Sequence, residues 1–345
     1  MSFKNLFRKK NNTLLFTTPS HSQKFCILKK FRHFYACDIS ETDTHDPQKF
    51  LVQAQTYAAE IYGTKQTLFL TNGSSSGIIA GVIALTKKGD KVLLWENSHR
   101  CHKNGVELAG GIPVYYQLPH NEFGVPDRTP PKLIENFLCD NKDIKVVIVT
   151  SPTYEGYVSD IKTIKSICSK HNAKLIVDEA HGALYPFSDN LPESAVKYAD
   201  ITVQSLHKTA GGLNPTALIH SNLDFDIQPA LDKITTTSPS YPLLASIEQN
   251  IFFLNSKKGK KSIENLITNI INLRQNSVNI EFGGDDITKI LIKKEGYTGF
   301  KLSELLYENN IEDEKTNNIS TMLLCGIGTT KQKLKKLQEI LSKIK

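Results

Sequence analysis

The sequence predicts an α/β fold in which a mostly parallel sheet is covered by helices on both faces. Seven short apolar runs lie between residues 67 and 220, and their apolar residues are continuous rather than alternating. Such runs are typical of strands that are buried on both faces. Helix-like segments separate several of them, as expected for parallel strands joined by helical crossovers. We therefore expect a seven-stranded sheet in a three-layer αβα domain.

The expected elements follow in order along the chain. Residues 1–12 are polar and basic without clear periodicity, and we expect a loose arm there. A helix over residues 53–62 ends at Gly63. Further helices are expected over residues 78–85 and 161–171. The seven expected strands are residues 67–71, 91–95, 112–116, 146–150, 174–177, 201–204 and 216–220.

The chain changes in character after about residue 255. A lysine-rich segment, residues 257–261, is interpreted as a hinge. The helix, strand, helix, strand and helix that follow are expected at residues 263–273, 289–292, 301–307, 321–324 and from 331 onward. This order predicts a small α+β domain. We divide the chain into an N-terminal arm (1–50), a large domain (51–255) and a small C-terminal domain (256–345).

Composition excludes several classes of protein. The 345 residues are 39% hydrophobic and 22% charged, with no apolar run near membrane-spanning length, so no membrane partner is expected. The net charge of +7 comes largely from local lysine runs, which are typical of solvated faces rather than nucleic-acid sites. The six cysteines show no CxxC or metal-ligand spacing, and no signal peptide is apparent. We expect reduced thiols, no metal site and a cytoplasmic protein.

A glycine- and serine-rich turn follows the first expected strand and runs into a helix. It contains Ser74, Ser75 and Ser76 within the stretch Thr71 to Gly77. Small residues allow close backbone approach, hydroxyls donate hydrogen bonds, and a helix N-terminus attracts anions. The turn therefore suits a phosphate group, although an ordinary capped loop is the alternative. The spacings of nucleotide-binding glycine loops are absent.

A loop with two histidines, His99 and His102, follows the second expected strand. An imidazole at this edge of the sheet can stack on an aromatic cofactor and transfer protons. The alternative is a solvated loop histidine.

An acid and a lysine end two further strands. Asp178 follows the run that begins at Lys174, and Lys208 follows the run that begins at Ile201. Pyridoxal phosphate (PLP) needs this pair, because a lysine amine forms the Schiff base and an acid keeps the pyridine nitrogen protonated. A helix-capping aspartate and an exposed lysine are the alternatives, but four suitable strand ends favour the cofactor. The motif Asp178-Glu179-Ala180-His181 also matches a helicase box, which requires an upstream phosphate loop that this sequence lacks.

These motifs together resemble the PLP-dependent fold-type-I superfamily, and within it the Orn/Lys/Arg decarboxylase group. The resemblance covers most of the chain. It runs through Thr18-Pro19-Ser20-His21, Asp38-Ile39-Ser40-Glu41, the Asn72 to Ser76 turn, Ser151 to Gly156, Asp178-Glu179-Ala180-His181-Gly182, Ser205-Leu206-His207-Lys208-Thr209, Thr237 to Tyr241, Gly296 to Gly299 and Gly326-Ile327-Gly328.

The resemblance implies a role for each matching residue. Lys208 would be the Schiff-base lysine and Asp178 the partner of the pyridine nitrogen. The ring-stacking histidine lies fourteen residues before the proline that opens the next strand, so Pro113 points to His99. Ser238 would reach the site of a neighbouring subunit, which implies a homodimer with shared active sites. The remaining implied cofactor contacts are Ser74, Ser75, Ser76, Ala180, His181, Ser205 and His207.

The implied activity is decarboxylation of lysine, ornithine or arginine, with Lys208 or His207 returning the proton to Cα. An acid should bind the distal cation of such a substrate. The candidate acids are Glu41, Asp43, Glu155, Glu281, Asp285 and Asp286.

Two alternatives stay open. The resemblance ends where longer decarboxylases continue into another domain, so an aminotransferase or lyase is possible on the same fold. A weakened homologue acting as a regulatory or interaction subunit is the second alternative. Leu184, where the family often has histidine, and a looser turn over residues 210–215 also depart from the family pattern.

Overall fold

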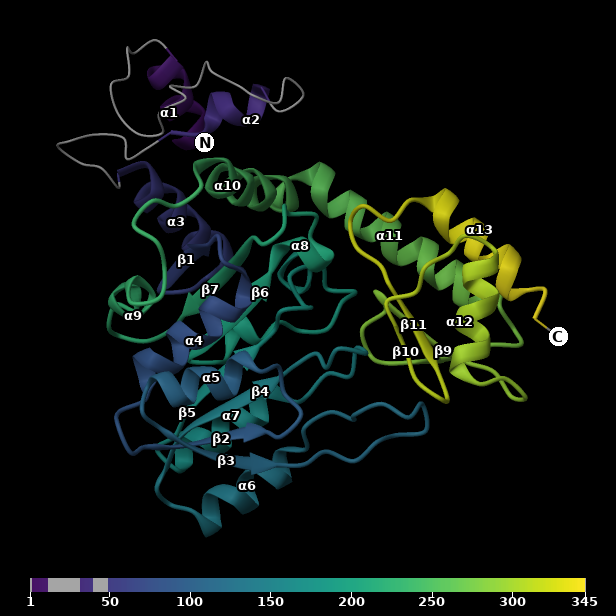
Figure 1. Ribbon diagram of the computed structural model, residues 1–345, viewed down its shortest axis with the longest axis horizontal. Coiled ribbons are helices and arrows are strands. Elements are labelled where there is room, and N and C mark those ends of the chain that lie inside the picture. The colour runs from purple at the N-terminus through teal and green to yellow at the C-terminus, as the bar shows by residue number, and fades with distance from the viewer. Residues whose placement is uncertain (1, 12–31, 40–48, 345) are drawn as a thin grey trace.

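The computed structural model describes residues 2–11, 32–39 and 49–344. One part of the molecule contains a seven-stranded sheet and another contains a four-stranded sheet. Figure 1 shows that α10 (Tyr241–Asn255) and α11 (Lys257–Gln275) lead from the first part to the second. The resembling segment at residues 18–21 and the acids Glu41 and Asp43 lie outside the described residues. Within the described ranges, no helix has the length and apolar character needed to span a bilayer.

The large sheet has the predicted strands in the order β1-β7-β6-β5-β4-β2-β3. Only β7 runs antiparallel to its neighbours. The prediction of seven mostly parallel strands is confirmed. The strands are β1 (Gln66–Leu70), β2 (Lys91–Trp95), β3 (Ile112–Tyr116), β4 (Ile144–Thr150), β5 (Lys174–Asp178), β6 (Ile201–Ser205) and β7 (Ala217–Ser221).

Helices cover both faces of this sheet, because neighbouring residues of each strand enter different cores. Leu94 packs in one core with Ile78 of α4 and Val106 of α5. Leu93 packs in the other core with Ile134 and Ile164 of the opposite helices. The three-layer arrangement is thus confirmed. One face carries α4 (Gly73–Leu85), α5 (Cys101–Leu108) and α9 (Gln228–Asp232), and the other carries α6 (Pro131–Asp140) and α7 (Ile161–Lys170).

The C-terminal part contains a four-stranded antiparallel sheet in the order β10-β11-β9-β8. The predicted alternation of helices and strands is present, although β8 and β10 were not predicted because they are only three and two residues long. The domain boundaries themselves stay a prediction. The elements are β8 (Glu281–Gly283), β9 (Lys289–Lys293), α12 (Gly299–Glu308), β10 (Lys315–Thr316), β11 (Thr321–Leu324) and α13 (Lys331–Leu341).

The predicted hinge at residues 257–261 is wrong, because these residues form the first turns of α11. Ser256 caps that helix, and its Oγ accepts a hydrogen bond from Gly259 N (3.0 Å). Lysine is a good helix former when its charge stays solvated, so the basic run continues the helix rather than interrupting it.

The expected loose arm at residues 1–12 is also wrong where the structure describes it. Residues Ser2–Asn11 form helix α1, with α2 (Arg32–Cys37) and α3 (Lys49–Tyr62) beyond it. Phe3 is buried and packs edge-on against Tyr241, with ring centroids 6.1 Å apart. Glu248 accepts hydrogen bonds from Ser2 N (2.6 Å) and Phe3 N (3.2 Å). These tertiary contacts stabilise the helix, whose apolar residues Phe3 and Leu6 are both buried.

Short segments complete the large part of the molecule. Two 3-10 turns, Tyr185–Phe187 and Ala195–Lys197, follow β5, and the single-turn helix α8 (Leu206–Thr209) follows β6 directly.

Gly156 joins the loop after β4 to the turn before β9. Its carbonyl accepts hydrogen bonds from Asp285 N (2.8 Å) and Asp286 N (2.9 Å). Its φ is +97°, and a Cβ there would lie 2.8 Å from Cγ of Lys289. This contact holds the loop that carries Tyr154 and Glu155 against the C-terminal part.

Replacing Gly156 with alanine should therefore lower the free energy of unfolding by about 2 to 4 kcal/mol, from backbone strain together with overpacking. Denaturant unfolding measures this loss. Gly63→Ala is the matched control, because φ is +66° there but no atom lies within 4 Å of the added Cβ. It should cost only about 1 kcal/mol. Equal losses in the two variants would show that the contact with Lys289 is unimportant.

Candidate active site

A cavity of about 480 Å³ opens where strands β1, β2, β4, β5 and β6 end at one edge of the large sheet. This is the edge at which ligands bind in open α/β sheets. The cavity wall combines residues that follow these strands with Lys315 from the C-terminal part. The cavity wall is therefore formed by segments that lie far apart in the sequence.

Lys208 lies in the cavity wall on α8, directly after β6. Its Nζ is 3.0 Å from Nε2 of His181, which also lines the cavity. Burial lowers the pKa of Lys208, although the carboxylate of Asp178 opposes this shift. Burial also lowers the pKa of His181 well below its usual value, and the positive charge of Lys289 adds to the effect. A larger fraction of the lysine amine is therefore uncharged and nucleophilic at neutral pH.

Asp178 is the last residue of β5, and its buried side chain lines the same cavity. One carboxylate oxygen, Oδ2, is 2.9 Å from Nε2 of His102, and Oδ1 accepts a hydrogen bond from Ala180 N (3.1 Å). Burial alone would raise the pKa of Asp178. The hydrogen bond from His102 and the nearby Lys208 outweigh burial and lower it. Asp178 is thus a carboxylate at neutral pH.

The serine turn lies at the N-terminus of α4. Ser74 and Ser75 line the cavity, and the N-cap residue Asn72 makes no side-chain hydrogen bond to the helix. The first N–H groups of α4 are therefore uncapped by Asn72 and can donate to an anion. Ser76 differs, because it is buried, does not line the cavity and donates its hydroxyl to Gly73 O (2.8 Å).

The two loop histidines occupy different places. His99 lines the cavity, and its Nδ1 lies 3.0 Å from Sγ of Cys101. His102 is fully buried beneath the cavity wall, where it contacts Asp178. His99 is therefore the histidine that can reach a ring in the cavity, as the resemblance implied, but its stacking role stays a prediction.

The other expected contacts are divided between the wall and the layer behind it. Ala180 and His207 line the cavity. Ser205 is buried and does not line it, but its Oγ is 3.0 Å from Nδ1 of His207. Burial lowers the pKa of His207, so the ring is neutral at pH 7.

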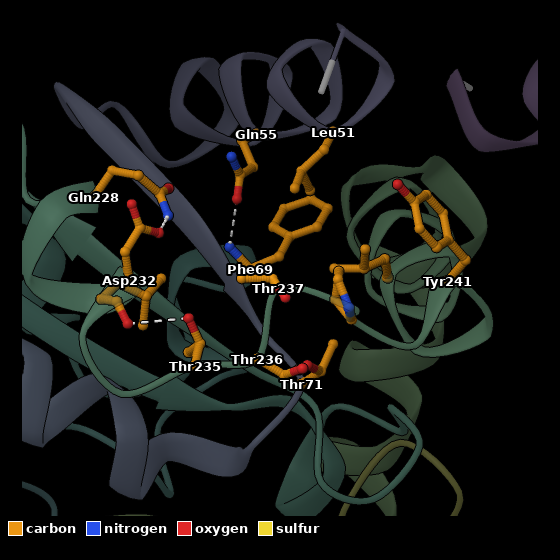
Figure 2. A pocket seen from close by; sticks show the side chains of 13 residues that line it. Leu51, Gln55, Phe69, Thr71, Gln228, Asp232, Thr235, Thr236, Thr237 and Tyr241 are labelled. Atoms are coloured by element: carbon orange, nitrogen blue, oxygen red, sulfur yellow. Dashed lines mark hydrogen bonds between the residues drawn. The ribbon is translucent and has the colours of Figure 1, made fainter. Parts of the chain in front are cut away.

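Ser238 lies outside this cavity, on an exposed part of the loop after α9. Its neighbours Thr237 and Pro239 line a separate cavity of about 320 Å³ between α3, β1, α9 and α10. Figure 2 shows Thr71, at the end of β1, in the same wall, close in sequence to the serine turn. Because the resemblance placed Ser238 in a neighbouring subunit's site, this expectation stays a prediction.

Of the candidate acids for a substrate cation, only Glu155 lines the cavity among those the structure describes. Its buried carboxylate is 2.6 Å from Nζ of Lys315. The other described candidates have different partners. Glu281 pairs with Lys293 (3.1 Å), Asp285 with Arg128 (3.2 Å) and Asp286 with the buried Lys289 (3.5 Å).

Two residues of the cavity wall, Tyr154 and Lys315, were given no role in the sequence analysis. Tyr154 lines the cavity, donates its hydroxyl to Glu314 and packs against His181 with ring centroids 4.7 Å apart. Nζ of Lys315 lies 5.0 Å from the centroid of the Tyr154 ring. Tyr154 lies within the resembling segment Ser151 to Gly156, whereas Lys315 is preceded only by the acidic stretch of residues 312–314 and lies on a two-residue strand.

The fold is that of the fold-type-I PLP enzymes. A model of the family described as "Orn/Lys/Arg decarboxylase, major domain" matches residues 10–287, and the chain belongs to this family. Orn/Lys/Arg decarboxylases are PLP-dependent enzymes.

Individual relatives agree with this assignment. The uncharacterized protein YaaO of Bacillus subtilis is 28% identical over 304 residues, which cover 83% of this chain and 63% of YaaO. The arginine decarboxylase of the same organism is 30% identical over 324 residues, which cover 88% of this chain and 66% of the enzyme. The chain thus spans slightly less than two thirds of each relative.

The structure of the Escherichia coli constitutive lysine decarboxylase is similar in fold. It superimposes with a TM-score of 0.85 at 20% identity, over 99% of this chain and 60% of that chain.

Proposed function

We propose that this chain binds PLP and decarboxylates a basic amino acid, namely lysine, ornithine or arginine. One observation carries the proposal. The amine of Lys208 and the carboxylate of Asp178 line a single cavity, together with Ser74 and Ser75 at the uncapped end of α4. A nucleophilic amine, an anion for the ring nitrogen and donors for a phosphate are the groups that PLP requires. The residues present therefore fit the cofactor.

Each residue has a distinct role in this proposal. Lys208 would hold the cofactor through its aldehyde, and Asp178 would keep a proton on the ring nitrogen. Ser74, Ser75 and the first N–H groups of α4 would bind the phosphate, and His99 and Ala180 would contact the ring. When bound, the cofactor accepts the electron pair released at Cα of the substrate.

Two side chains in the cavity wall can move the proton that replaces CO2 at Cα. Lys208 has a lowered pKa, and both Lys208 and the adjacent His207 line the cavity. Either can donate a proton to Cα after the carboxylate leaves. Tyr154 and His181 pack together in the cavity wall, and Nε2 of His181 lies 3.0 Å from Nζ of Lys208.

Glu155 is the acid that we propose for the distal cation of the substrate. Its carboxylate already accepts a hydrogen bond from Lys315. A substrate ammonium or guanidinium must therefore share Glu155 with Lys315 or displace it. The length of the side chain that can reach Glu155 would then decide between lysine, ornithine and arginine.

Separate assays of CO2 and keto acid test the proposed reaction. Protein reconstituted with PLP is incubated with each amino acid in turn. We expect CO2 and the matching amine from one basic amino acid, with little keto acid. Keto acid without CO2 would instead indicate an aminotransferase. Protein that binds no PLP would favour the regulatory or interaction subunit.

We also propose a cytoplasmic homodimer. Ser238 is exposed, which suits a residue that would reach a second subunit's site. The cysteines of the described ranges are all free thiols, which suits a reducing compartment. Sedimentation of the PLP-bound protein, compared with Ser238→Ala, tests whether dimerisation and cofactor affinity depend on this loop.

A further inference from the structure

His102 is a buried histidine next to the proposed cofactor site without being part of its wall. Its side chain is 0% exposed, and its Nε2 is 2.9 Å from Oδ2 of Asp178. The backbone N–H of His102 donates to His99 O (2.9 Å) at the start of α5. The same turn therefore places His99 at the cavity and His102 behind Asp178.

The other ring nitrogen of His102 identifies the tautomer. Nδ1 is buried and has no hydrogen-bond partner among the described residues. A protonated Nδ1 would be an unpaired donor in the interior, and a charged ring would need partners at both nitrogens. The proton of His102 that has a partner is therefore the one on Nε2, and this N–H donates to Asp178.

The two carboxylate oxygens of Asp178 are held from two directions. His102 binds Oδ2, and the backbone N–H of Ala180 binds Oδ1. These two bonds fix the plane of the carboxylate and stabilise its charged form, which burial would otherwise disfavour. The remaining lone pairs can face the cavity.

The contacts of a second buried histidine, His220, differ from those of His102. In His220, Nδ1 is 2.9 Å from Oγ1 of Thr67 and Nε2 is 3.3 Å from Oε1 of Gln204. Both of its nitrogens have neutral partners, and it does not line the cavity. Within the described part of the chain, His102 instead has one side-chain partner, the carboxylate in the cavity wall.

We propose that His102 is a positioning residue that orients Asp178 and keeps it ionised, so that Asp178 can hold a proton on the ring nitrogen of PLP. This inference rests on the proposed function, because it requires PLP in the cavity. His102 does not touch the cofactor in this account and acts only through Asp178.

The protonation state of the ring nitrogen tests this role. PLP carrying ¹⁵N in the ring is bound to wild type, His102→Leu, His102→Gln and His220→Leu, and the ¹⁵N chemical shift is measured. We expect a protonated ring in wild type and in His220→Leu, and a shift toward neutral pyridine in His102→Leu. The amide of glutamine can donate from nearly the same place as Nε2, so His102→Gln should keep much of the wild-type shift.

Affinity provides a second readout. Loss of a hydrogen bond to a charged group should weaken PLP binding by about tenfold to a hundredfold in His102→Leu. If His102→Leu does not fold, His102→Asn gives the same prediction, because its amide is too short to replace Nε2. An unchanged ¹⁵N shift and affinity in His102→Leu or His102→Asn would overturn the role of His102 alone. Wild-type protein that binds no PLP would instead overturn the proposed function.

Discussion

Replacing Lys208 with alanine should abolish covalent attachment of PLP and lower the rate of CO2 release by at least about 10³-fold. Lys208 brings the amine into the cavity, with Asp178 in the same wall. Burial lowers the pKa of Lys208, so the amine is available for reaction at neutral pH. Absorbance of the bound cofactor and CO2 release measure the two effects.

An exposed lysine outside the site serves as the control. Lys170 lies in the last turn of α7, away from the cavity. Lys170→Ala should keep wild-type absorbance and turnover. Turnover of Lys208→Ala within tenfold of wild type would show that another group carries the chemistry.

Replacing Asp178 with asparagine should lower turnover by about 10²- to 10³-fold, because the amide cannot supply the negative charge that stabilises a protonated ring nitrogen. The change is nearly isosteric, so the effect should appear mainly in kcat. Steady-state kinetics and the ¹⁵N shift of bound PLP measure it. If Asp178 only accepted the Ala180 N–H as a local cap, the loss would be confined to about 1 kcal/mol of stability.

The pH dependence gives a further check on Asp178. Its pKa in the folded protein lies below the ordinary value of 3.8. The ionised carboxylate therefore stabilises the folded protein at pH values above its ordinary pKa. This stabilisation is lost as the pH falls through the lower pKa that Asp178 has in the folded protein. Activity between pH 5 and pH 8 should show no titration of this carboxyl. Asp189→Asn, an exposed aspartate substitution, should leave both turnover and its pH dependence unchanged.

The large sheet and the residues at its strand ends could be predicted because local sequence determines both. Continuous apolar runs marked the strands, and Asp178 and Lys208 follow two of these runs directly. Parallel strands bring their carboxyl ends to one edge, so the order of strands was not needed to place both residues there.

Residues that depend on three-dimensional packing could not be predicted. Glu155 and Lys315 meet across 160 positions of sequence, and Lys315 lies on a two-residue strand without periodicity. The resemblance selected His99 for the cavity, but the contact between the buried His102 and Asp178 was not predicted, because it depends on how the start of α5 packs against β5. Helix α1 was missed for the same reason, since Phe3 is stabilised by its contact with Tyr241.

Borohydride reduction of the PLP-reconstituted protein, followed by peptide mass spectrometry, tests the central claim most directly. The account predicts loss of the cofactor's visible absorbance and a single pyridoxyl group on the peptide that contains Lys208. A pyridoxyl group on another lysine, or no modified peptide from protein saturated with PLP, would contradict it.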